Sequence, residues 1–269
     1  MDFNNDHYYK LNRIFLSAIG LWPHRYIILR QLQGIISSFI FISVIIPQLT
    51  KLITTRSDMD VILRVLSSAL PFMLFTVKYI TFYFVTEDIK KLMQQIQNDW
   101  NALKNNNELE IIHRYAKAAK LSTISLATLI YICITMVICN QYIPSFLNIV
   151  APRNKSRRAE LLFQVEYFVD HEKYYHTIQF HLEIGLILAA ITILSTESFC
   201  LSLAIHAFGM FKIASFRMEH IIDKNASNVS MKKHCIFHDN IVIAVNGHRR
   251  AIDFLFAVFP NNNIAEHNE

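Results

Sequence analysis

Glycine is scarce in this sequence, with only five among 269 residues. That is about 2%, whereas soluble proteins average about 7%. Charged residues are also few, at 17%, where a soluble domain carries about 25%. A phosphate-binding loop needs glycine so that backbone amides can approach the phosphate, and a nucleotide-binding α/β fold is therefore disfavoured.

The four cysteines form no close pair in the sequence, and three of them lie in strongly apolar runs. We therefore interpret them as small buried side chains rather than as a disulfide framework or a metal site. The N-terminus lacks the basic, apolar and small-residue order of a cleaved signal peptide. The formal net charge of +5 could suggest a nucleic acid partner, but 53% hydrophobic residues favour a lipid bilayer as the partner instead.

Long apolar runs are what this sequence has in abundance. The uncharged run 31–50 covers 20 residues, which as an α-helix is about 30 Å long and can cross a bilayer. Three further runs, 65–85, 121–146 and 184–211, are apolar on nearly all sides. A helix on the surface of a soluble protein would keep a polar face. We therefore predict an all-α, polytopic membrane helix bundle with four transmembrane helices.

The segments between and after these runs have a different pattern. Residues 87–120 have helical spacing with mixed charge and are expected to continue the flanking helices, with a break near residues 105–107. Residues 238–259 predict an amphipathic helix that does not span, followed by the polar, turn-prone residues 260–269. We find no internal repeat in the sequence.

The distribution of lysine and arginine predicts the orientation in the membrane. Seventeen of them fall on the side that holds the N-terminus and seven on the other side. Because positively charged residues concentrate on the cytoplasmic side, we predict a cytoplasmic N-terminus. The glycosylation sequon at Asn154 is then extracellular, whereas those at Asn225 and Asn228 are cytoplasmic.

Two residues that carry a formal charge lie inside the predicted spans, one of which also contains His206. Lys78 lies in the second half of its span, so its amine can extend to the cytoplasmic interface or join a structural pair. Glu197 lies nearer the middle of its span, where a carboxylate is costly and must face protein or water. A packing or hydrogen-bonding role for Glu197 competes with a role in ligand response or ion passage.

The twelve histidines prompt a search for metal sites. His234 and His238 have the i, i+4 spacing of a helical metal pair, but a membrane-bound di-iron enzyme needs several such pairs. We interpret the histidines as solvated or interfacial. No zinc-protease, nucleophile-elbow or P-loop motif is present in the sequence, and we predict no enzyme, no metal and no cofactor.

Aromatic residues gather before the fourth apolar run, in the order Tyr167, Phe168, Tyr174, Tyr175 and Phe180. They fit an aromatic belt at the membrane interface, or the cover of an apolar pocket for a small lipophilic ligand. On the second interpretation, residues of helices two to four in the outer half of the bundle line the pocket. The candidate ligand-binding residues are Phe72, Phe75, Met136, Tyr142, Tyr175 and Phe180.

Four segments together resemble the insect odorant receptors. YYKLNRIFLSAIGLWP at 8–23 resembles the N-terminal signature of that family, and VEYFVDHEKYYHTIQFH at 165–181 resembles its second outer loop. HAFGMFKIASFRMEHII at 206–222 is similar to the segment that leaves the fourth helix, and NGHRRAIDFLFAVF at 246–259 to the helix that leads to the fifth. They occur in the order and spacing of the family.

This resemblance implies a receptor with seven helices and a cytoplasmic N-terminus, located in the plasma membrane of olfactory sensory neurons. Such receptors join a shared co-receptor to form an odorant-gated cation channel. The resemblance also implies three further helices, so we expect residues 1–259 to be a partial, C-terminally truncated receptor domain that gives no current alone. Residues 260–269 are expected to lie outside the family pattern. A four-helix membrane protein with a structural or interaction role and a relative of the gustatory receptors remain alternatives.

Overall fold

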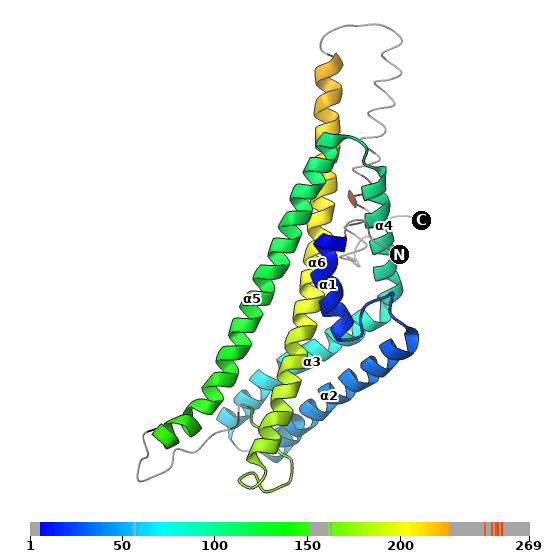
Figure 1. Ribbon diagram of the computed structural model, residues 1–269. Helices are drawn as coiled ribbons and strands as arrows, with labels where there is room; N and C mark the ends of the chain where they lie inside the picture. The colour runs from blue at the N-terminus through cyan, green and yellow to red at the C-terminus, as the bar shows by residue number, and fades with distance from the viewer. Residues whose placement is uncertain are drawn as a thin grey trace. The chain divides into compact units, whose positions relative to one another are not determined.

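The computed structural model describes residues 6–55, 58–150, 161 and 163–225, together with 245, 249, 251, 252 and 254. Within these residues the chain is helical and has no strand (Figure 1). Among the described helices, four are long and apolar enough to cross a membrane. These findings confirm the predicted all-α membrane fold and its four spans.

The first three helices include the first two predicted spans. A short helix α1 (Asp6–Ala18) precedes α2 (Ile27–Thr54) and α3 (Met59–Phe84), and α2 and α3 pack side by side (Figure 1). Asp58 caps α3, because its carboxylate accepts hydrogen bonds from the backbone amides of Asp60 and Val61. The predicted run 31–50 lies inside α2, and 65–85 ends one residue beyond α3.

The last two described helices extend beyond the apolar runs predicted at 121–146 and 184–211. Helix α4 (Thr86–Ala102) ends just before the predicted break, and α5 (Asn106–Val150) and α6 (Tyr175–Asn225) follow. Helix α5 begins with the polar residues predicted to continue the span, and it passes through Pro144 to its end. The predicted amphipathic helix at 238–259 lies mostly outside the described residues.

The chain divides into two compact units. The first comprises Met1–Asn12, Glu87–Ile124 and Glu197–Glu269, and the second comprises Arg13–Thr86 and Ser125–Thr196. Helices α1, α5 and α6 contribute residues to both units, which we describe separately.

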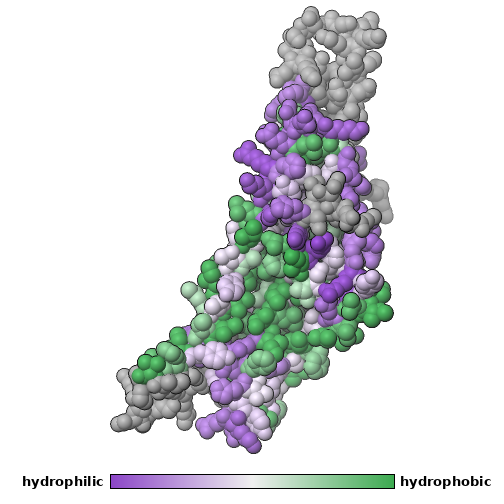
Figure 2. All heavy atoms as spheres, in the orientation of Figure 1, coloured by the Kyte–Doolittle hydropathy of each residue, from purple (hydrophilic) through white to green (hydrophobic). Residues whose placement is uncertain are grey.

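In the second unit, close helix contacts define the core. At Gly185 of α6 a β-carbon would lie 2.6 Å from Cγ2 of Val44 in α2, so only glycine permits this approach. Tyr79 of α3 is 1% exposed and donates a hydrogen bond to the Ile19 carbonyl at 2.9 Å. Hydrophobic side chains also cover much of the visible surface of the protein (Figure 2). Such a surface is expected where lipid replaces water around the helices.

In the first unit, polar groups are buried between helices. Asn12 of α1 donates to Ser202 Oγ at 2.7 Å and accepts from Thr123 Oγ1 at 3.2 Å. His206 Nε2 lies 3.2 Å from a carboxylate oxygen of Asp99. Buried polar groups need such partners, and in lipid they also hold helices together.

The prediction that the cysteines are buried is wrong for two of them. Cys133 and Cys139 on α5 are exposed, and Cys200 on α6 is half-buried. The error arises because hydrophobicity does not imply burial inside the protein when the surrounding solvent is lipid. Cys235 lies outside the described residues.

Candidate functional site

The described loop before α6 (residues 163–174, hereafter the connecting loop) contacts α2 and α3 in the second unit. The Glu166 amide donates a hydrogen bond to the Pro47 carbonyl of α2 at 2.9 Å. Val165 beside it is only 3% exposed. Asp170 accepts hydrogen bonds from the amides of Glu172 and Lys173, a turn that directs the chain into α6. The loop is therefore held to α2 by its backbone.

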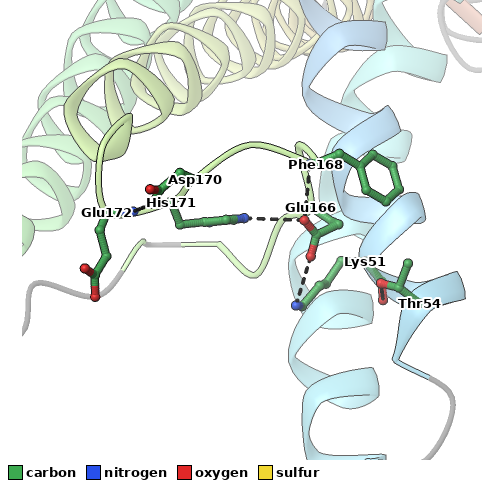
Figure 3. A network of polar contacts seen from close by, with 7 residues as sticks. All are labelled: Lys51, Thr54, Glu166, Phe168, Asp170, His171 and Glu172. Carbon is green, nitrogen blue, oxygen red and sulfur yellow. Dashed lines mark hydrogen bonds and ion pairs between the residues drawn. The ribbon is translucent and has the colours of Figure 1, made fainter.

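Glu166 forms the polar centre of this loop (Figure 3). Its carboxylate lies 3.4 Å from Lys51 Nζ and 3.5 Å from His171 Nε2, and it accepts the Phe168 amide at 3.2 Å. Burial alone would raise the pKa of Glu166, but the hydrogen bonds from Phe168, His171 and Lys51 and the charge of Lys51 outweigh it and lower the pKa. The carboxylate therefore stays ionised and can hold Phe168, whose φ of 55° is uncommon for a residue other than glycine.

A second chain of hydrogen bonds joins the connecting loop to two helices. The Tyr167 hydroxyl lies 2.7 Å from His181 Nδ1, and His181 Nε2 lies 2.9 Å from Ser43 Oγ. Ser43 donates its own proton to the Ile40 carbonyl at 2.8 Å, so its oxygen accepts from His181 Nε2. His181 Nδ1 is then an acceptor, and Tyr167 donates to it. Burial raises the pKa of Tyr167 to about 12, which keeps this donor protonated.

Helices α5 and α6 are joined by a carboxylate that the sequence interpretation did not include. Glu183 of α6 accepts the Tyr142 hydroxyl at 3.3 Å and the Gln179 amide at 3.0 Å. Gln179 is 3% exposed, whereas Glu183 is half-buried. Such a half-buried carboxylate gives an apolar site one strong hydrogen-bond acceptor.

Aromatic rings from α3 and the connecting loop form a cluster. Phe72 is 3% exposed, and its ring centroid lies 6.3 Å from that of Phe75 and 5.4 Å from that of Phe163. Both ring pairs are edge-on, the arrangement that aromatic quadrupoles favour. Phe163 was not among the predicted residues, because nothing in the sequence places a loop residue against α3.

Residues 58–258 match the family model described as 7tm Odorant receptor. The chain belongs to the odorant receptor family. Comparison with curated proteins finds no match. Together with the four spans, the family makes this chain a multi-pass transmembrane receptor of olfaction.

The structure places the predicted ligand-binding residues of this receptor in different surroundings. Phe72 and Phe75 come together, Tyr142 reaches Glu183, and Tyr175 is half-buried at the start of α6. Met136 and Phe180 are 67% and 65% exposed. The ligand-binding role of all six residues stays a prediction.

The two ionisable residues predicted inside the spans of the receptor both engage other residues. Lys78 is half-buried on α3, and Glu197 is exposed on α6. Asn154, the glycosylation candidate, lies outside the described residues, as do His234 and His238. Among the residues that the structure describes, no group of three histidine, cysteine or acidic side chains could hold a metal ion.

Proposed function

We propose that this receptor detects small lipophilic odorants as a subunit of a cation channel formed with the family's co-receptor. The observation that carries the proposal is the family match over residues 58–258. The surroundings of the connecting loop support it, because they combine an aromatic cluster with a few polar groups, the composition typical of small-molecule sites.

We further propose that different residues of the site supply apolar contact and hydrogen bonds. Phe72, Phe75 and Phe163 supply apolar contact area, and Tyr167, His181 and Glu183 supply hydrogen bonds that distinguish alcohols, esters and aldehydes. Tyr142, Tyr175, Met136 and Phe180 complete the proposed lining. An odorant opens the channel only if it binds the open state more tightly than the closed state.

The first test measures odorant binding by the purified receptor in detergent. A panel of volatile alcohols, esters and aldehydes competes with a fluorescent apolar probe, and at least one odorant is expected to displace it. Phe72→Ala removes a buried ring and is expected to weaken binding about tenfold or more. Tyr167→Phe keeps the ring but leaves His181 Nδ1 without its donor. It is expected to weaken the binding of polar odorants more than the binding of apolar ones.

Leu63→Ala serves as the matched control, because Leu63 lies on the same helix as Phe72 and is 61% exposed. It is expected to leave binding unchanged. A folded receptor from which no odorant displaces the probe would contradict odorant detection and favour a structural or interaction role. Odorant-evoked current in cells that express the receptor with the co-receptor tests the channel partnership separately.

We also propose that the N-terminus is cytoplasmic and that the receptor resides in the plasma membrane of olfactory sensory neurons. Glycan mapping on the expressed receptor is expected to find sugar at Asn154, and Asn154→Gln is expected to abolish it. Asn225 and Asn228 are expected to stay unmodified. Sugar on either of these two residues would reverse the orientation.

A further inference from the structure

Helices α2 and α3 enclose an apolar groove with a volume of about 500 Å³. Its walls include Ile35, Phe39 and Ile42 from α2 and Ile80, Tyr83 and Phe84 from α3. Phe39 and Phe84 are 71% and 77% exposed, so the groove opens outward. Both helices belong to the second unit, and the groove is separate from the connecting loop in sequence and in lining.

The floor of the groove is held by tight packing. A β-carbon at Gly34 would lie 2.8 Å from Cε2 of Tyr83, so the Tyr83 ring lies directly against the α2 backbone. Tyr79 is nearly fully buried and is fixed by its hydrogen bond to the Ile19 carbonyl. The groove is therefore preformed rather than created by loose side chains.

An arginine lies next to one end of the groove, outside its lining. Arg30 lies one turn before Gly34 on α2, and its guanidinium carbon is 6.0 Å from the centroid of the Tyr83 ring. Its Nε is buried and has no hydrogen-bond partner among the described residues. The Arg30 side chain as a whole is only half-buried, and a guanidinium binds phosphate and carboxylate through paired hydrogen bonds. This end of the groove is therefore suited to an anion.

The length of the groove suits a lipid chain. From Gly34 to Ile42 the lining runs eight residues along α2, or about 12 Å at 1.5 Å per residue. The hydrocarbon of one leaflet is about 15 Å deep, half of a bilayer core. An occupant with an anionic head at Arg30 and one apolar chain in the groove therefore matches both the charge and the depth.

We propose that this groove binds one acyl chain of an anionic phospholipid, whose headgroup accepts hydrogen bonds from Arg30. A neutral lipid or an apolar helix of another chain would cover the groove but would offer no anion to the guanidinium of Arg30. The anionic lipid satisfies both features at once. The groove is a separate site from the proposed odorant-binding residues, because its lining includes none of them.

The test uses the full chain in nanodiscs of phosphatidylcholine that contain a trace of photoreactive lipid. Phosphatidylserine and phosphatidylcholine with the same photoreactive acyl chain are compared, and labelled peptides are mapped by mass spectrometry. Labelling within 34–42 and 79–84 is expected to be about fivefold higher with phosphatidylserine, since one basic residue contributes about 1 kcal/mol near an anionic surface. Arg30→Gln is expected to reduce it to the phosphatidylcholine level.

Arg64→Gln is the charge control, because Arg64 is exposed on α3 and does not line the groove. Ser38→Phe fills the groove and is expected to reduce labelling with both lipids, whereas Ile36→Phe on an exposed face outside the groove is not. Raising the salt concentration tests the same preference in the unmodified chain, because screening weakens it. Equal labelling by both lipids at low salt, or labelling that survives both Arg30→Gln and Ser38→Phe, would overturn the proposal.

Discussion

Replacing Glu108 by alanine is expected to lower the free energy of unfolding by about 3–5 kcal/mol, because it leaves a partly buried arginine without its partner. Glu108 lies in the first turn of α5, and its side chain is 9% exposed. Its two oxygens accept Arg217 Nε at 2.7 Å and Nη2 at 2.8 Å. This paired geometry is the strongest form of a charge-assisted hydrogen bond.

A double-mutant cycle isolates this pair from other effects. Glu108→Leu and Arg217→Met are each expected to lower the thermal unfolding temperature of the detergent-purified receptor. The double variant Glu108→Leu with Arg217→Met is expected to recover much of the loss, because no charge is then buried alone. Equal and additive losses would show that the two side chains act independently.

The exposed ion pair on α4 provides the control for this cycle. Asp88 lies 2.7 Å from Lys91 Nζ, but both side chains are largely exposed. Solvent screens such a pair, so Asp88→Ala is expected to leave the unfolding temperature nearly unchanged. A large loss in the control would mean that any charge removal destabilises this receptor.

The helices of this receptor could be predicted because their signal is local. An uncharged run such as 31–50 specifies a span by its own composition, and the break before Asn106 is carried by adjacent polar residues. The order of the four segments similar to odorant receptors was also readable along the chain. The family match over residues 58–258 agrees with that interpretation.

The pairings between helices could not be predicted, because each depends on which face of one helix meets which face of another. Glu108 and Arg217 stand far apart in the sequence, and nothing near either residue identifies the other. His181 was interpreted as interfacial, yet it bridges the connecting loop and α2. A single sequence shows the period of a helix but not its rotation about its own axis.

The same limit affects the candidate ligand-binding residues. Phe72 and Phe75 lie within one turn of α3 and were predictable as neighbours, but Phe163 reaches them through the connecting loop. Phe180 and Met136 were chosen for their chemistry and depth, and the structure leaves both mostly exposed. The position of a residue along a membrane-spanning helix can be estimated from the sequence. The direction in which its side chain points is known only when the neighbouring helices are placed.

Gly185→Leu is expected to destabilise the receptor by about 3 kcal/mol and to abolish odorant-probe binding, because α6 can no longer approach α2. The first added carbon would lie 2.6 Å from Val44 Cγ2, and valine has little rotamer freedom in a helix with which to withdraw. Ser43 and His181 lie beside this contact along their helices, so moving α6 away breaks their hydrogen bond. Gly185→Ala should have a smaller effect, because alanine regains about 1 kcal/mol of helix propensity.

Rescue by a second substitution distinguishes this contact from a general intolerance of bulk. Val44→Ala removes the colliding methyl groups and is expected to restore part of the unfolding temperature and probe binding of Gly185→Ala. Ile187→Phe adds bulk at a position of α6 that is 42% exposed and is expected to change neither. Val44→Ala could instead lower the unfolding temperature of Gly185→Ala by as much as it lowers that of the unmodified receptor. In that case the two residues do not compete for space, and the inferred close approach of α2 and α6 is wrong. If stability is rescued but probe binding is not, the Ser43–His181 bond does not position the site.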